Sequence, residues 1–452
     1  METEDQPADA AVVGVRPQHA RRTFLQRSAV AAAGTVAAGG AAAAEGKRIR
    51  LAMVGTGHRG IHAWGGPVLR DYADLVEFVG LCDVNPARAE VARELIGTRA
   101  PAFTDFERMV RETRPDTVIV TTIDGTHADY VCRAMRLGCD VICEKPLCTE
   151  AAQAQASVDV QRATGRRLTV TLNARHGGAA VKVKELLLAG EIGEILQINF
   201  DEVLDRRHGA DYFRRWHAFS RNSGTLLCQK GVHQFDQLNW WLGSDPVEVM
   251  AYGRLAIYGR NGPFRHSHCR PCPFKEKCEF HFDITKDAAA MRLYVACEGE
   301  DGYLRDACVY RDGIDVPDTM TLQIRYAAGQ LVCYALHAAA PYEGRFVVFN
   351  GTRGRIEVRE YDRQPWEVPA AAEIRVTTAG GATRSIPVQA RGAGHGGADT
   401  RLRDAIFHPA ADPLGQRAGL QEGLLSALVG IAGRTSIAER RPVRIADLVR
   451  MG

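Results

Sequence analysis

The chain has 452 residues, of which 46% are hydrophobic and 25% are charged, and its formal net charge is +3. This length predicts two domains rather than a single core. The near-neutral charge argues against a nucleic-acid or anionic-membrane partner, because such surfaces need concentrated basic charge. After the first 45 residues, no apolar run approaches the roughly 20 residues that cross a bilayer.

Residues 1–45 have the order of a twin-arginine (Tat) export signal. The pair Arg21-Arg22 and a Phe-Leu dipeptide precede a stretch over residues 28–44 that is rich in Ala, Gly and Val and ends in small residues. We expect export through the Tat machinery to the periplasm or another extracytoplasmic compartment. The alternative is a disordered, alanine-rich leader with a chance arginine pair.

A glycine-rich turn follows the first predicted strand, residues 49–54. Its G-x-G-x-x-G pattern allows a tight turn, a close approach of a diphosphate to the backbone, and close packing of the next helix. The N–H groups at the start of that helix can donate to the diphosphate. The pattern alone also fits an ordinary glycine-rich turn. The turn consists of Gly55, Thr56, Gly57, His58, Arg59 and Gly60.

The second predicted strand, residues 75–82, ends in Asp83. This is the separation expected for the acid that binds the adenosine ribose hydroxyls. Because Asp83 would repel a 2′-phosphate, the sequence favours NAD over NADP, although Arg88 nearby keeps NADP open.

Strands and helices then alternate, which predicts a doubly wound parallel sheet over residues 47–170. The expected helices are 86–97, 104–112 and 127–138, and the expected strands are 117–122, 140–143 and 168–172. Ligands bind at the carboxyl ends of such strands. Further cofactor contacts are therefore expected from Thr121, Thr122, His127, Glu144 and Lys145.

Lys145 is the strongest candidate for a catalytic residue in this domain. A lysine at a strand end in a nucleotide crevice can hydrogen-bond the substrate hydroxyl and stabilise a developing alkoxide, and burial can lower its pKa. The alternative is a solvated lysine that is paired with a carboxylate.

Residues 49–60, Asp83, the 121–127 loop and the Glu-Lys-Pro stretch at 144–146 together resemble the Gfo/Idh/MocA family. The resemblance covers nearly the whole chain after the leader. It implies an α/β protein: a Rossmann domain, then an α/β domain with a large open, mainly antiparallel sheet. It implies NAD(P)-dependent oxidation or reduction of sugars, cyclitols and their derivatives, with Lys145 as the catalytic lysine. Since the open sheet commonly forms a dimer face in this family, we expect a homo-oligomer.

The second domain is expected to span residues 171–452. Arg175 and His176 follow a strand end and are expected to face the substrate; the alternative is that they brace the surface between the domains. Residues 205–224 are predicted to be a loop rich in Arg, His, Trp and Gly, which suits either a carbohydrate or a dimer contact.

His233 and Asp236 lie on one face of a predicted helix. His233 can remove the hydroxyl proton while hydride leaves the same carbon, and Asp236 can orient it. The resemblance supports this role, because the family's catalytic histidine lies in the same Gly-x-His-x-x-Asp context. Many members have an aspartate four residues earlier, where this chain has Gln229. Lys230 follows it, and can support the catalytic lysine and bind a sugar oxygen.

An insertion over about 262–310 holds five of the twelve cysteines. A Cys-x2-Cys pair and a third cysteine suit tetrahedral zinc, with a fourth cysteine, His281 or His268 completing the ligands. Disulfides, which an exported protein permits, and free thiols are the alternatives. The candidate zinc ligands are Cys269, Cys272, Cys278 and Cys308.

The C-terminal part predicts strands at 319–326, 331–338, 345–350 and 354–359, a surface excursion over 360–390, and helices at 398–407 and 416–438. His395, in a glycine-rich loop, resembles a family position near the active site and is a substrate candidate.

Together these features predict an exported NAD(P)-dependent oxidoreductase that transfers hydride between a hydroxyl of a sugar, cyclitol or glycoside and a bound nicotinamide. His233 would take the proton and Lys145 would stabilise the oxygen. Because NAD is scarce outside the cytoplasm, export also predicts a tightly held cofactor. One alternative is a redox-neutral NAD-dependent glycosidase. Another, of a different class, is a non-catalytic sugar-binding protein, which the intact motif residues argue against.

Overall fold

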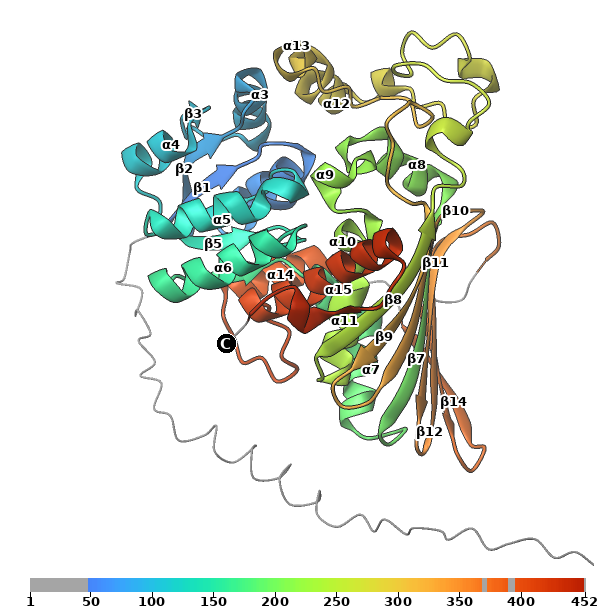
Figure 1. The fold of residues 1–452 in the computed structure, drawn as a ribbon. Helices are drawn as coiled ribbons and strands as arrows, with labels where there is room; N and C mark the ends of the chain where they lie inside the picture. Colours follow the sequence, from blue (N-terminus) through green and yellow to red (C-terminus); the bar gives the residue numbers. More distant parts are fainter. Residues whose placement is uncertain (1–47, 368–371, 389–394, 451–452) are drawn as a thin grey trace, which may run out of the picture. The chain divides into compact units, whose positions relative to one another are not determined.

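The computed structural model describes residues 48–367, 372–388 and 395–450. The predicted export leader lies outside the described residues. The α/β fold class is confirmed: a six-stranded parallel sheet, here called sheet A, precedes a nine-stranded, mostly antiparallel sheet, called sheet B (Figure 1).

Sheet A has the strand order β3-β2-β1-β4-β5-β6, and all of its pairs are parallel. Its strands are β1 (Ile49–Val54), β2 (Val76–Cys82), β3 (Ala102–Phe103), β4 (Thr117–Val120), β5 (Asp140–Cys143) and β6 (Leu168–Val170). Leu51 and Met53 pack into one hydrophobic cluster, and Ala52 and Val54 into another. Both faces of β1 are therefore buried, as the continuous apolar run predicts.

Helix α3 begins where the sequence offers a cap. Asn85 Oδ1 accepts the Arg88 N–H at 2.9 Å, and Pro86 occupies the first helical position of α3. The helices of this domain are the π-helix η1 (Gly60–Gly65), α2 (Gly66–Asp71), α3 (Pro86–Ile96), α4 (Phe106–Thr113), α5 (His127–Arg136) and α6 (Ala151–Thr164).

Sheet B has the order β14-β13-β12-β11-β7-β10-β9-β8-β15. The β7–β10 pair is parallel, and the other pairs are antiparallel. The strands are β7 (Ile195–Asp205), β8 (Pro246–Arg254), β9 (Thr319–Tyr326), β10 (Leu331–Ala340), β11 (Glu343–Gly351), β12 (Gly354–Arg363), β13 (Ala372–Thr378), β14 (Thr383–Val388) and β15 (Val443–Arg444). Burial alternates along β9, so one face of the sheet is packed and the other is open.

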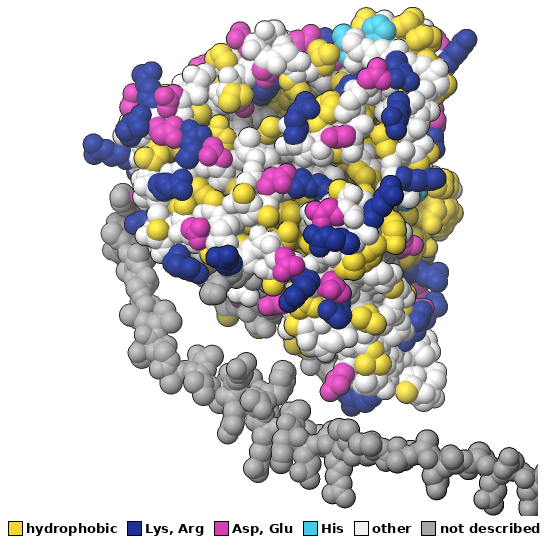
Figure 2. Space-filling view, viewed as in Figure 1, with side chains coloured by type: hydrophobic (Ala, Val, Ile, Leu, Met, Phe, Trp, Pro, Cys, Tyr) yellow, Lys and Arg dark blue, Asp and Glu magenta, His cyan; other side chains and the backbone are white. Residues whose placement is uncertain are grey.

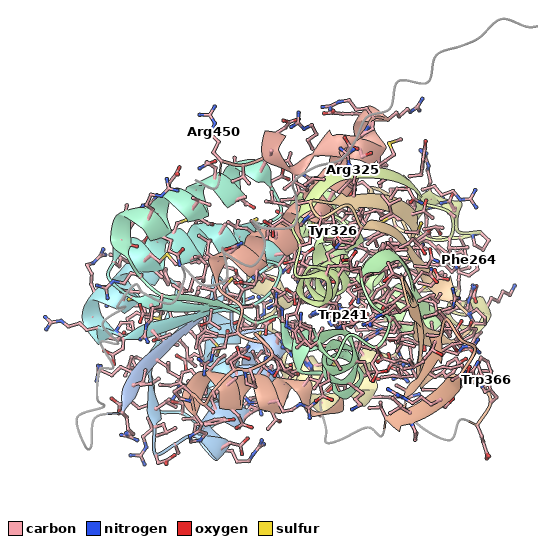
Figure 3. The ribbon with its side chains drawn as sticks, turned by 90° about the horizontal axis from the view of Figure 1, so that it is seen from below. Trp241, Phe264, Arg325, Tyr326, Trp366 and Arg450 are labelled. Carbon is pink, nitrogen blue, oxygen red and sulfur yellow. The ribbon has the colours of Figure 1, made fainter. Side chains whose placement is uncertain are left out.

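Helices cover the packed face of sheet B: α7 (Gly178–Leu188), α10 (Leu226–Gln229), α11 (Gly231–Leu242) and α15 (Leu420–Glu439) (Figure 1). Trp241 and Tyr326 lie among these packed side chains, whereas Trp366 lies at the periphery (Figure 3). The Trp241 indole N–H donates to Ala180 O at 3.1 Å. Helix α15 also contacts α6 and β6, so it ties the two sheets together.

Two segments differ from their predictions. Residues 205–224, expected to be a loop, contain α8 (Arg206–Arg214) and α9 (Ser220–Ser223), because Asp205 Oδ1 accepts the His208 N–H at 2.7 Å and caps α8. Residues 360–390, expected to be a surface excursion, contribute β13 and β14. Alternate apolar side chains of β13 are buried, which places that strand in the sheet.

The insertion has mostly short helical turns, including η6 (Lys275–Lys277), α12 (Ala288–Leu293), η8 (Val295–Cys297) and α13 (Glu298–Asp301). It returns to the first domain, where α12 lies beside α3 (Figure 1). The Asn85 side-chain amide donates to Cys297 O at 2.9 Å. Residues far apart in sequence therefore meet at the carboxyl end of β2.

Within the described part of the chain, no helix combines the length and apolarity needed to cross a membrane. Acidic and basic side chains are interspersed over the face in Figure 2, in keeping with the near-neutral formal charge.

Candidate active site

The glycine-rich turn after β1 packs against the loop after β4. Gly55 has a φ of +87°, and a Cβ there would lie 2.5 Å from the Thr122 backbone nitrogen. A Cβ on Gly60 would lie 2.6 Å from Gly55 O. The first and third glycines are therefore required by close backbone approach. Gly57 faces more open space, since a Cβ there would lie 3.5 Å from the Tyr294 hydroxyl.

Asp83 lies at the carboxyl end of β2, beside the turn. Its Oδ2 accepts the Thr56 backbone N–H at 2.8 Å and the Thr56 hydroxyl at 3.0 Å. Its Oδ1 accepts the Asn85 N–H at 3.0 Å and lies 3.5 Å from Arg88 Nη1. The carboxylate therefore fixes the turn as well as lying where a ribose acid is expected.

Thr121 and His127 hold the neighbouring loops in place. The Thr121 hydroxyl donates to Gly55 O. His127 is buried, with Nδ1 2.7 Å from Pro146 O and Nε2 3.1 Å from Thr122 O. Burial lowers the pKa of His127, while the hydrogen bonds to the Pro146 and Thr122 carbonyls oppose that shift. The ring bridges the loops after β4 and β5. Both residues act here as positioning residues.

Glu144 and Arg59 form a partly buried network at the same edge of sheet A. Glu144 Oε1 accepts the Arg59 Nε–H at 2.7 Å and the Trp64 indole N–H at 2.9 Å. Burial alone would raise the pKa of Glu144, but Arg59 and Trp64 hold it below its usual value. The Arg59 guanidinium also donates to both oxygens of Asp399, each at 3.1 Å, which connects the turn to α14 (Ala398–Phe407).

The side chain of Lys145, which follows β5, contacts the segment just before α11. Its ammonium donates to Gln229 O at 2.7 Å. Desolvation lowers the pKa of Lys145, while Asp124 and Glu144 oppose that shift. Burial raises the pKa of Asp124, and its Oδ2 has no hydrogen-bond partner within the described residues. The sequence reasoning missed Asp124, although it lies in the loop between β4 and His127.

Lys230 immediately precedes α11, one residue after the carbonyl that Lys145 contacts. Its ammonium lies 3.1 Å from Glu202, which also lies 3.3 Å from Arg345. Burial alone would lower the pKa of Lys230, but Glu202 and Tyr212 hold it above its usual value. Lys230 is therefore suited to donate a hydrogen bond as a cation rather than to accept a proton.

His233 is half-buried in the first turn of α11, and its N–H donates to Lys230 O at 3.3 Å. The Gln229–His233 segment therefore carries the carbonyl bound by Lys145, the cation of Lys230 and the imidazole of His233. Lys145 and His233 are therefore linked to Lys230 through backbone carbonyls of this segment: Lys145 bonds to Gln229 O and the His233 N–H bonds to Lys230 O.

Arg175, predicted to face the substrate, and Asp236, predicted to orient His233, bind each other. Arg175 Nη2 lies 2.6 Å from Asp236 Oδ1, and the two side chains are 4% and 0% exposed. Arg175 also donates to Gly415 O at 3.1 Å. His176 is buried, and burial lowers its pKa to about 4. These contacts favour the bracing alternative for Arg175 over direct substrate contact.

The insertion covers the nucleotide side of the site. The His58 N–H, in the glycine-rich turn, donates to the Tyr294 hydroxyl at 2.9 Å. Arg88 Nη2 lies 2.8 Å from Asp301, and the Arg88 guanidinium lies 5.8 and 5.9 Å from the ring centres of Tyr294 and Tyr303. No local sequence signal could have found Tyr294, because it lies 236 positions from its partner.

Two family models match the chain. The Oxidoreductase family, NAD-binding Rossmann fold model matches residues 49–172, and the Oxidoreductase family, C-terminal alpha/beta domain model matches residues 184–445. The chain belongs to the Gfo/Idh/MocA oxidoreductase family. The Rossmann match includes every residue predicted to hold the cofactor, and the glycine-rich turn followed by Asp83 fits a dinucleotide.

Relatives place the chain among oxidoreductases. YteT, named as an oxidoreductase of Bacillus subtilis (strain 168), is 32% identical over 430 residues, which covers 89% of this chain and 99% of YteT. Inositol 2-dehydrogenase of Salmonella typhimurium is 27% identical over 205 residues, which covers 43% of this chain and 56% of that enzyme. A solved structure of levoglucosan dehydrogenase with NADH and levoglucosan has the same fold, with a TM-score of 0.64, 18% identity, and coverage of 88% of this chain and 100% of that chain.

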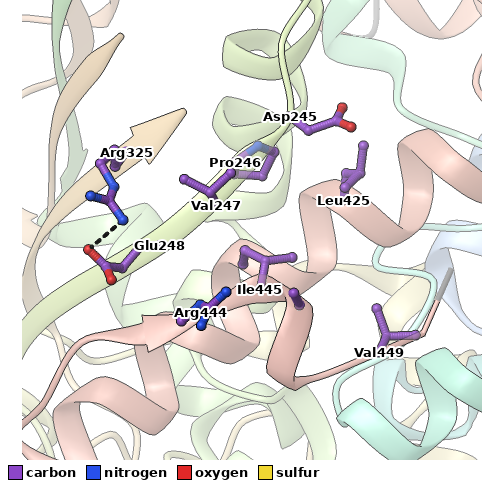
Figure 4. A pocket seen from close by; sticks show the side chains of 10 residues that line it. Asp245, Pro246, Val247, Glu248, Arg325, Leu425, Arg444, Ile445 and Val449 are labelled. Atoms are coloured by element: carbon purple, nitrogen blue, oxygen red, sulfur yellow. Dashed lines mark ion pairs between the residues drawn. The ribbon is translucent and has the colours of Figure 1, made fainter. Parts of the chain in front are cut away.

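Two further features of this Gfo/Idh/MocA chain are a pocket and the position of His395. A surface pocket of about 620 Å³ lies near the C-terminus, where Arg325 and Glu248 form a 3.5 Å ion pair (Figure 4). It is lined by residues that were not predicted for the site. The backbone of His395 begins η9 (His395–Gly397) just before α14, while the position of its side chain is outside the described structure.

Proposed function

We propose that the chain transfers hydride between NAD and a hydroxyl-bearing carbon of a sugar, cyclitol or glycoside. The observation that carries this proposal is the partly buried Lys145 ammonium, held 2.7 Å from Gln229 O at the start of the segment that bears His233. Bound NAD would supply the hydride acceptor. The chain's own residues supply the binding surface and the proton transfer.

Each of the three polar residues has a distinct role in this proposal. Lys145, with its lowered pKa, hydrogen-bonds the reacting oxygen and stabilises the charge that develops there. His233 accepts the hydroxyl proton in the oxidation direction. Lys230 remains a cation beside Glu202 and binds a second oxygen of the substrate.

The surroundings of Arg88 support NAD over NADP. Its guanidinium already lies between Asp83 and Asp301, and the Tyr294 and Tyr303 rings lie beside it. A 2′-phosphate would bring further negative charge close to these two carboxylates. We therefore propose NAD as the physiological nucleotide.

The insertion supports slow release of that nucleotide. Residues 294–303 lie over the glycine-rich turn and the end of β2, and they contact both through the His58 and Arg88 interactions. Tight retention suits the export that residues 1–45 predict. We propose Tat export to an extracytoplasmic compartment, and replacing Arg21 and Arg22 together by lysine is expected to leave the protein in the cytoplasm.

The decisive experiment uses the full chain after export. The protein is denatured and the released NAD(H) and NADP(H) are quantified; intact protein is then mixed with a panel of sugars and cyclitols while nicotinamide absorbance is followed. We expect NAD(H) in near-stoichiometric amount and a substrate-dependent change in its redox state. Absence of nucleotide, together with no turnover when NAD is added, would overturn the proposal.

A redox-neutral glycosidase is the second candidate function, because it too would retain its nucleotide. Such an enzyme would oxidise its substrate transiently, eliminate, hydrate and reduce again, so it would never need to exchange its nucleotide. It would cleave a glycoside with no net change in nicotinamide absorbance. A dehydrogenase would show net NADH formation on the same substrate panel.

A further inference from the structure

Four cysteines of the insertion line one small cavity. The lining also includes His268, His281 and apolar side chains, and the cysteines are Cys269, Cys272, Cys278 and Cys308. The cavity has a volume of about 10 Å³, which is close to one water-sized sphere. This space suits a single ion and excludes an organic ligand.

Backbone hydrogen bonds bring the four thiols to that cavity from two crossing segments. The Cys269 N–H donates to Asp306 O at 2.8 Å, and the Cys308 N–H donates to Ser267 O at 3.0 Å. Cys272 follows in a turn, where its N–H donates to Cys269 O at 3.2 Å. Cys278 ends the next short helix, η6. The convergence is therefore built by the backbone and does not depend on one side-chain conformation.

Amide groups point at three of the sulfur atoms. The Tyr310 N–H donates to Cys308 Sγ at 3.4 Å. The backbone N–H groups of Phe282 and Phe280 donate to the Cys269 and Cys278 sulfurs. Such donors stabilise thiolate, which is the form that binds a metal.

All four thiols are free in the structure. Within the described residues, no group of three or more His, Cys, Asp or Glu side chains is already arranged to hold a metal ion. The four cysteines line the cavity, but their side chains are not arranged as a metal site. Rotation about the Cα–Cβ bonds moves each sulfur between staggered positions while the backbone stays in place.

We propose that Cys269, Cys272, Cys278 and Cys308 bind one structural Zn²⁺ with tetrahedral geometry. Four thiolates around an ion-sized space match the closed ligand set of a structural zinc site. The insertion has mostly short helical turns, so a cross-link at its base would fix the path of the chain that leads to α12 and α13. Binding releases the thiol protons and involves no change of oxidation state.

The test measures zinc in the full-length exported protein, purified without chelators and without a histidine tag. Elemental analysis is expected to find about one zinc per chain. Cys269→Ser and Cys278→Ser are expected to lose most of it. Two matched controls keep it: Cys297→Ser, which removes a buried thiol of the same insertion outside the cavity, and Cys333→Ser on β10.

A second measurement covers the case in which the cavity variants do not fold. The wild-type protein is titrated with a mercurial reagent that blocks thiols, and zinc release is followed with a chromogenic chelator. Zinc should appear in step with the blocking of four thiols. Protein without zinc overturns the proposal, whether mass spectrometry of the unreduced chain then finds disulfides among these cysteines or finds all four thiols free.

Discussion

The Lys145 ammonium donates a 2.7 Å hydrogen bond to the backbone carbonyl of Gln229, so a residue of the nucleotide-binding sheet is held by the helical segment that carries His233. The hydrogen bond fixes the distance between the end of β5 and the start of α11. It also keeps a charged donor in a partly desolvated place, where electrostatic stabilisation of a developing alkoxide is strongest.

Lys145→Met is expected to lower kcat by about 10²- to 10⁴-fold, the range for losing one acid–base or oxygen-stabilising group. Nucleotide content should stay near the wild-type value, because the glycine-rich turn and Asp83 are unchanged. The matched control is Lys182→Met, which removes an exposed ammonium that pairs with Glu185 on α7. A wild-type kcat for Lys145→Met would show that Lys145 takes no part in catalysis.

The rate of oxidation is expected to fall on the alkaline side as Lys145 loses its proton. Since desolvation lowers the pKa of Lys145, this limb should begin well below the pH at which an ordinary lysine titrates. The kcat/KM of the wild type is measured against pH to locate it.

Asp124→Asn is expected to move the same limb to lower pH by about one unit. The carboxylate of Asp124 favours the charged form of Lys145, and its removal lowers the pKa of the ammonium further. Asp129→Asn, at an exposed site on α5, should leave the profile unchanged. A shift to higher pH, or none, would show that Asp124 does not support the charge of Lys145.

Much of the fold follows from sequence because local signals and burial agree in sheet A. The apolar run of β1, the N-cap at Asn85 and the Asp83 strand end each predict their elements within a few residues. Sheet B was harder, because Asp205 can begin a helix as readily as end a strand. Ion pairs across long separations, such as Arg59 with Asp399, leave no local signal.

The candidate site shows the same limit. The positions of Lys145 and Lys230 follow from strand and helix ends, which sequence patterns indicate. The partners do not: Arg175 and Asp236 look equally suited to a sugar until the structure pairs them. Tyr294 lies 236 positions from His58 in the sequence, and the fold of the insertion brings the two residues into contact.

Asp301→Asn is expected to raise the dissociation rate of NAD(H) about 3- to 10-fold, because it weakens the ion pair that holds α13 to Arg88. The rate is measured by chasing bound nucleotide with an excess of a labelled analogue. Glu300→Gln is the matched control: it removes a carboxylate from the adjacent, exposed position of the same helix. Equal NAD(H) dissociation rates in the two variants would show that this contact of the insertion does not slow the release of the nucleotide.

Asp236→Asn distinguishes the two interpretations of Arg175. Breaking a buried ion pair typically costs about 3–5 kcal/mol of folding free energy, because one charge stays buried without its partner. If the pair braces the protein, the melting temperature falls clearly while KM for the substrate, measured well below that temperature, changes less than about threefold. Asp245→Asn, exposed just beyond α11, should alter neither quantity. A KM increase of tenfold or more at unchanged melting temperature would instead place Asp236 in contact with the substrate.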